Sequence, residues 1–202
     1  MVFEIILFSI LSIITAIIIL LLNRRSFDLK NYNPNIRGWK VLITAAVIKI
    51  TAEFLFKKFT DVTLLRILSL NWVIYFGLIY VSILNIKKSF MMLVFLGTLF
   101  NFAAIAANGF KMPVYVSDLL SDVEAKKMFL LSGKDLVHTL LTEETRLKFL
   151  CDIFTLHPPY PFPKAISVGD VFLFAGVFAF WQDLFYESSR AREDKPANNQ
   201  RG

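Results

Sequence analysis

Residues 90–115 read FMMLVFLGTLFNFAAIAANGFKMPVY, and they contain both the kind of element that builds this protein and the signal that ends it. The first part is an almost unbroken apolar run that ends at Ala107. A helix needs ~20 such residues to cross the core of a bilayer. Asn108 and Gly109 form a turn and helix-stop signal, and Pro113 prevents the helix from resuming directly afterwards. The stretch therefore predicts a membrane-spanning helix that stops abruptly.

The whole chain of 202 residues has the same character, because 56% of its residues are hydrophobic and only 19% are charged. Soluble domains usually carry ~25% charged residues. The composition and the long apolar runs predict an all-α, polytopic membrane protein with about five transmembrane helices. Glu4 precedes the first run and basic residues follow it, which is the reverse of a cleaved signal peptide. The predicted spans are residues 2–22, 39–56, 63–86, 90–107 and 166–186.

Basic residues predict how these spans are oriented, because lysine and arginine gather in short cytoplasmic loops. With five spans, most basic residues near span ends fall on one side, between the first two spans, at Lys87 and Lys88, and in the C-terminal tail. We expect a multi-pass cell-membrane protein whose N-terminus is outside and whose C-terminus is cytoplasmic. The net charge of +6 is then explained by basic residues that meet the anionic headgroups of the lipid bilayer, which is the expected partner. The sequence has no basic stripe of the kind that binds nucleic acid, so no nucleic-acid partner is expected.

The domain organisation follows from these spans. Residues 1–187 are expected to form a single membrane domain, and the polar residues 188–202 a disordered cytoplasmic tail. Between the fourth and fifth spans, residues 108–165 predict an outer cap of short amphipathic helices that cannot bury their apolar faces alone. The expected cap elements are helices within 117–131, 134–141 and 145–154, followed by the extended, proline-rich stretch 157–165.

Polar residues inside apolar runs are the first candidates for a functional site, since they are costly in a bilayer. Lys49 and Glu53 lie four residues apart in the second span and form an intramembrane charged pair. They are expected either to pair two helices or to line an ion or substrate path. Asn101 lies in the fourth span, where an interhelical hydrogen bond or a ligand site are the alternatives.

Further candidates lie at the outer ends of the last two spans. Ser167 and Asp170 have the spacing of a capping box, in which the serine caps the helix and the acid three residues later bonds back. The alternative is that Asp170 faces Asn108 and binds a cation or a headgroup. His138 and Asp152 lie in the cap. Together with His157 they match no recognised metal-site spacing, so no metal site is predicted.

No catalytic motif is present in the sequence. It has no nucleophile elbow, no phosphate-binding loop and no dinucleotide fingerprint. We therefore assign no catalytic residues and expect no cofactor. The single cysteine, Cys151, excludes an intramolecular disulfide and is expected to be a packing residue.

Several motifs together resemble a small family of bacterial integral membrane proteins that is known only as a domain of unknown function. The motifs are NG-x-x-MPV from Asn108, the loop histidine His138, T-x-L-x-x-L-x-D-x-F from Thr145, a proline-rich stretch, and S-x-G-D from Ser167. The resemblance covers mainly the second half of the chain. It implies a bacterial plasma-membrane location and a shared face formed by these motifs, and it implies no activity.

These observations favour a non-enzymatic integral membrane component that binds a partner subunit, or a lipid-like or small ligand, at its outer face. A membrane-protein partner or a homo-oligomer is compatible with this interpretation. A first alternative is a small membrane enzyme that acts on a lipid-linked substrate through His138, Asp152 or Asp170. A second alternative is a transporter or ion-path subunit that uses Lys49 and Glu53.

Overall fold

The computed structural model describes residues 2–29, 34–58, 72–118, 122–135 and 137–193. Within these ranges the protein is mostly helical, with six α-helices, one short 3₁₀ helix and four three-residue strands. The helices are α1 (Val2–Leu22), α2 (Trp39–Lys58), α4 (Trp72–Leu84), α5 (Ser89–Ala107), α6 (Val123–Leu131) and α7 (Val168–Glu193). The other elements are β1 (Met112–Val114), β2 (His138–Leu140), η2 (Lys148–Leu150), β3 (Phe154–Leu156) and β4 (Lys164–Ile166).

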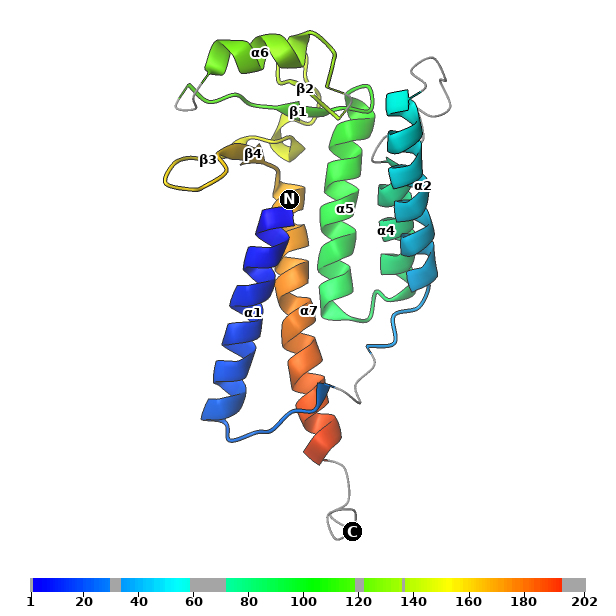
Figure 1. Cartoon of the computed structure of the whole chain (residues 1–202), viewed down its shortest axis with the longest axis vertical. Coiled ribbons are helices and arrows are strands. Elements are labelled where there is room, and N and C mark those ends of the chain that lie inside the picture. Colours follow the sequence, from blue (N-terminus) through cyan, green and yellow to red (C-terminus); the bar gives the residue numbers. More distant parts are fainter. Residues whose placement is uncertain (1, 30–33, 59–71, 119–121, 136, 194–202) are drawn as a thin grey trace.

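The five longer helices run side by side, and the described residues between positions 108 and 166 lie across one end of them (Figure 1). We call residues 108–166 the cap. Along the row of helices α1 packs on α7, α7 on α5, α5 on α4, and α4 on α2. The N-terminus, the end of α5 and the start of α7 all lie at the cap end (Figure 1). The opposite end holds the end of α1 and the connection between α4 and α5 (Figure 1).

Three of the described helices are long and apolar enough to cross a membrane, namely Phe3–Leu22, Ser89–Ala107 and Val168–Arg190. These three helices are compatible with a membrane protein. Helix α2 is long enough but carries four lysines and a glutamate. Helix α4 is apolar but has only 13 described residues. The start of the predicted third span, residues 63–71, lies outside the described residues.

The bounds of α1, α2 and α5 agree closely with the predicted apolar runs, whereas the last helix extends beyond its predicted C-terminal end. Helix α7 continues to Glu193, so the prediction of a disordered tail from residue 188 is wrong for residues 188–193. The cause is packing, because Phe185 forms a buried cluster with Ala16 and Leu20 of α1. Ser188 and Ser189 are also buried, at 1% and 0% exposure. Residues 194–202 lie outside the described residues.

The described part of the cap contains one α-helix rather than two or three. Helix α6 ends before the predicted Ser132–Gly133 stop, but the helices predicted for 134–141 and 145–154 are wrong. Strand β2 forms instead and pairs in parallel with β1, with Met112 opposite His138. Strand β3 pairs antiparallel with β4, with Phe154 opposite Ile166. Apolar runs this short have no clear periodicity, so partners distant in the sequence determine their conformation.

The proline-rich stretch also differs from its prediction. It was expected to be extended throughout, whereas residues 157–163 form the loop of the β3–β4 hairpin. Two aromatic side chains of this loop pack against Phe3 at the start of α1, with ring centroids 5.8 Å away for Tyr160 and 5.0 Å away for Phe162. The hairpin therefore joins the cap to the first helix.

Candidate functional site

The predicted stop at the end of α5 positions the cap. The chain turns at Asn108, and Gly109 has a φ of 67°, a conformation that glycine adopts without strain. The Asn108 side chain donates to the backbone oxygens of Ala104, at 2.7 Å, and Arg146, at 2.9 Å. Its own oxygen accepts from the backbone N–H of Arg146 at 2.9 Å. Asn108 therefore fastens the cap to α5.

A buried polar network joins α5 to the start of α7. Asn101 Nδ2 donates to Asp170 Oδ1 at 2.9 Å, and Ser167 Oγ donates to Asn101 Oδ1 at 2.7 Å. The Asp170 backbone N–H donates to Ser167 Oγ at 2.9 Å, and the Ser167 N–H lies 3.3 Å from Asp170 Oδ2. The last two bonds are those of a capping box. Because Asn101 completes the network, this helix cap is also an interhelical contact.

Close approach of the two helix backbones makes this network possible. A Cβ atom on Gly169 would lie 2.0 Å from Asn101 Oδ1 and 2.7 Å from the backbone oxygen of Gly97. A Cβ atom on Gly97 would lie 2.6 Å from the backbone oxygen of Gly169. Glycine is therefore required at both positions, and the crossing of α5 and α7 is fixed at the level of Asn101.

A cavity of about 390 Å³ opens between this network and the cap. Its walls come from four helices, from strands β1, β2 and β4, and from the loops between them. The cavity is mainly apolar with a small group of charged and polar side chains, which is typical of ligand sites. The lining residues that matter below are Tyr75, Asn101, Lys126, Leu130, Asp152, Lys164 and Asp170.

Asp152 is the most unusual of these residues. Strand β1 holds its backbone, since the Asp152 N–H donates to Pro113 O and its oxygen accepts from the Tyr115 N–H. The residue is only 7% exposed, and its Oδ1 atom has no hydrogen-bond partner among the described residues. Burial and the nearby Asp170 raise the pKa of Asp152 to about 8, although Lys164 opposes this rise.

His138 also lines the cavity, and its side chain is 42% exposed. Its Nδ1 atom lies 3.1 Å from Asp135 Oδ2. The other Asp135 oxygen accepts from the backbone N–H groups of Val137 and His138, at 2.8 and 2.9 Å. Burial acts to raise the pKa of Asp135, but these N–H donors and His138 outweigh it and lower the pKa. No group of three or more potential metal ligands occurs within the part of the chain that the structure describes.

Lys164 is the main cavity residue that the sequence did not suggest. Its Nζ lies 2.8 Å from Glu4 Oε1, and the Tyr160 hydroxyl donates to the same oxygen at 2.5 Å. Glu4 lies near the start of the first apolar helix, and it is only 2% exposed. Nothing in the sequence marked a single lysine in a proline-rich loop as part of a functional site, and the same holds for Tyr75 and Lys126. The pairing of Lys164 with Glu4 depends on the β3–β4 hairpin, which was not predicted.

The remaining candidates lie elsewhere. Lys49 and Glu53 are on α2, and Lys49 does not line the cavity. The side chain of Glu53 lies outside what the structure describes. Ser167 and Asn108 support the cavity without lining it. Cys151 is fully buried, and burial together with Asp152 raises the pKa of its thiol to about 11, so it is a packing residue rather than a nucleophile.

The sequence was compared with known proteins. No match was found among curated proteins or among solved structures. A family model described as a family of unknown function, DUF5317, matches residues 33–182, which is about three quarters of the chain. The match includes α2, the cap with its cavity, and α7 as far as Gln182, whereas α1 lies before it. The chain therefore belongs to the DUF5317 family.

Proposed function

We propose that this protein is a non-enzymatic, five-span cell-membrane protein that binds a small or lipid-like ligand in the cavity under its cap. The cap lies on the outer face, with the N-terminus outside and the C-terminus in the cytoplasm. The observation that carries the proposal is the cavity itself. It is mostly apolar, and it contains a buried carboxyl oxygen, Asp152 Oδ1, without a hydrogen-bond partner among the described residues. Such an atom is costly unless a ligand satisfies it.

Exposed apolar surface supports the membrane part of the proposal. On α1 every fourth residue is an isoleucine that is about half exposed, at positions Ile6, Ile10, Ile14 and Ile18. Helix α2 has a comparable set with exposures from 53% to 69%, at Ile43, Val47, Ile50 and Phe54. Soluble proteins rarely expose apolar patches of this size. Surfaces of this kind on α2 favour its placement in lipid despite its charged residues.

Charge supports the orientation. The helix ends opposite the cap adjoin the basic residues Arg24, Arg25, Arg37, Lys40, Lys87, Lys88 and Arg190. Basic residues in short loops mark the cytoplasmic side. The cap then faces outward, and its cavity lies at the level where the outer ends of α5 and α7 meet the lipid headgroups.

The ligand proposal is tested with a matched pair of variants on α6. Leu130 is 6% exposed and lines the cavity, whereas the adjacent Leu131 is 65% exposed. Purified protein is incubated with a total lipid extract, and retained small molecules are measured by native mass spectrometry. We expect retention by the wild type and by Leu131→Trp, and loss in Leu130→Trp. Circular dichroism and size-exclusion profiles serve as controls for folding. Empty wild-type protein, or equal retention by Leu130→Trp, would contradict the proposal.

One observation favours a second candidate, a membrane enzyme that acts on a lipid-linked substrate. Two buried carboxyl groups, Asp152 and Asp170, share the cavity, and the pKa of Asp152 lies near neutrality, as is common for general acids and bases. The lipid extract from the binding experiment also serves to test this candidate. A lipid that is chemically altered by wild-type protein, but bound unaltered by Asp152→Asn, would favour the enzyme over the binding protein.

A further inference from the structure

The charged residues that line the cavity are of both signs. Two carboxyl groups lie in its interior, since Asp152 and Asp170 are each 7% exposed. Asp170 accepts from Asn101 and from the Ser167 N–H, both neutral donors. Asp152 Oδ1 accepts no hydrogen bond among the described residues. The interior therefore holds two buried carboxyl groups, and one carboxyl oxygen has no donor among the described residues.

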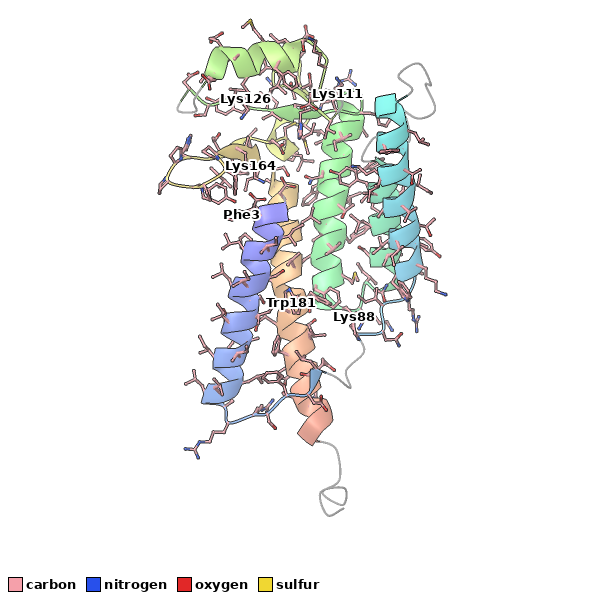
Figure 2. All side chains as sticks on the ribbon, in the orientation of Figure 1. Phe3, Lys88, Lys111, Lys126, Lys164 and Trp181 are labelled. Atoms are coloured by element: carbon pink, nitrogen blue, oxygen red, sulfur yellow. The ribbon has the colours of Figure 1, made fainter. Side chains whose placement is uncertain are left out.

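Two lysines lie on the cavity walls, on different elements of the cap. Lys126 comes from α6 and Lys164 from β4 (Figure 2). Lys164 is held by Glu4 at 2.8 Å, which fixes its position without removing it from the cavity wall. A ligand that enters between the cap and the helices therefore meets basic groups as well as the acidic interior.

We propose that the ligand is a zwitterion whose ammonium group binds between Asp152 and Asp170 and whose anionic group contacts Lys126 and Lys164. This inference rests on the proposed function. A phosphoethanolamine group has this chemistry, because an ammonium with several N–H donors lies two carbons from a phosphate. Its ammonium supplies a donor for Asp152 Oδ1 and a positive charge for the carboxylate pair. The apolar lining residues, among them Phe129 and Leu130, suit an attached acyl chain.

Other ligand classes fit the cavity less well. An anion without an amine would place negative charge beside two carboxyl groups. A tightly held metal ion needs a larger set of ligands than the described residues provide, because they contain no group of three potential metal ligands. A quaternary ammonium carries the charge but has no N–H to donate to Asp152. The primary amine is therefore the chemistry that the interior selects.

Binding of an ammonium group requires the ionised form of Asp152. The charged and titratable groups around Asp152 are Asp170 on α7, Lys164 on β4, Tyr75 on α4 and the adjacent Cys151, together with three further lining residues, Asp135, His138 and Lys126. Since the pKa of Asp152 is about 8 without ligand, affinity should rise up to about tenfold per pH unit between pH 6 and 8. A protonated His138 would repel an ammonium, so the variant His138→Gln separates its contribution.

The test uses purified protein in nanodiscs or detergent with three lipids of the same acyl chains. These are phosphatidylethanolamine, phosphatidylcholine and phosphatidylglycerol. Free phosphoethanolamine is a fourth arm, which distinguishes a soluble ligand from a lipid. We expect phosphatidylethanolamine to bind at least about tenfold more tightly than the other two lipids, equivalent to ~1.4 kcal/mol. Tight binding of free phosphoethanolamine alone would identify the soluble compound as the ligand and support the same ammonium site.

Variants assign the effect to the carboxyl group. Asp152→Asn should abolish both the preference for the primary amine and its pH dependence. Asp118→Asn, at a side chain that is 84% exposed, should change neither. Equal binding of the three lipids that Leu130→Trp abolishes would overturn this inference while leaving the proposed function intact. Absence of binding in every arm, for the wild type, would overturn both.

Discussion

At the scale of single residues, Gly169 is the position most constrained by its surroundings. We predict that Gly169→Ala lowers the stability of the protein by about 1–3 kcal/mol, because the new methyl group overlaps Asn101 and forces α5 and α7 apart. The midpoint of thermal unfolding in detergent measures this effect. Val171→Ile adds a methyl group to an exposed position of the same helix and serves as the control. Equal midpoints for both variants would refute the close contact.

Asp152 should give the protein a pH dependence of stability that is opposite to that of most carboxylates. Its pKa is about 8 in the folded protein, against an ordinary value of 3.8. Between these values the folded state holds a proton that the unfolded chain has released. This contribution to stability therefore falls as pH rises from about 4 to about 8, by up to about 1.4 kcal/mol per pH unit.

Asp152→Asn should remove this contribution, so we predict that the variant is more stable than the wild type at pH 8 and that the difference shrinks toward pH 5. Unfolding midpoints measured across this range in ligand-free protein give the result. Asp118→Asn, whose side chain is largely exposed, should follow the wild-type curve. Parallel curves for the wild type and Asp152→Asn would show that Asp152 is ionised throughout.

The sequence identified those cavity residues whose chemistry conflicts with their local context. Asn101 stands in an apolar run and Asp170 opens one, so both were recognisable as costly unless partnered. Asp152 and His138 were named as polar residues of the cap and as possible catalytic residues, but no local pattern placed them in one cavity. Lys164 and Tyr75 were missed because a lysine in a loop and a tyrosine in an apolar helix are common. Their role depends on distant partners, which no local pattern encodes.

At the scale of elements, the β3–β4 hairpin connects α1, the cap and the cavity. Lys164 of this hairpin pairs with Glu4, whose side chain is 3% exposed. We predict that Glu4→Gln lowers the free energy of unfolding by about 2–3 kcal/mol. This is somewhat less than the loss expected when a fully buried ion pair is broken, because Lys164 retains contact with solvent. Hydrogen exchange of the backbone amides of residues 154–166 should become faster, since the hairpin loses its ion pair with α1 and keeps only the aromatic contacts with Phe3.

The exposed pair of Glu143 and Lys148, 3.4 Å apart, provides the control for that experiment. Glu143→Gln should leave exchange in the hairpin unchanged, because exposed ion pairs contribute little. Unchanged exchange in Glu4→Gln as well would mean that aromatic packing of Phe3 on Tyr160 and Phe162 alone holds the hairpin.

The sequence predicts some elements better than others, because some are determined by local signals and others by contacts between residues that are distant in the sequence. Helix α5 was predicted closely because its apolar run and its Asn108–Gly109 stop are local signals. Strand β2 was not, because its partner β1 lies 26 residues earlier in the register of Met112 with His138. The continuation of α7 to Glu193 was also missed, because the sequence alone marks this polar segment as exposed, whereas Ser188 and Ser189 are buried.

At the scale of the whole molecule, the arrangement in the membrane can be tested by labelling. Cys151 is fully buried and its thiol has a raised pKa, so the native protein should resist maleimide reagents. We predict that Glu143→Cys, in the cap, reacts with an impermeant maleimide on intact cells. Ser26→Cys, on the loop after α1, should react only after the membrane is opened. The reverse pattern would place the cap on the cytoplasmic side.

Only Ser167 separates strand β4 from helix α7, so a movement of this cavity wall should be transmitted directly to the last helix. At 1.5 Å per residue the 26 residues of α7 measure about 39 Å, and a tilt of about 5° displaces the far end by about 3 Å. That far end carries Tyr186, over whose ring the Arg25 guanidinium lies at 5.7 Å. Paired spin labels near these two residues would thus read, from the opposite side of the molecule, any shift of the hairpin.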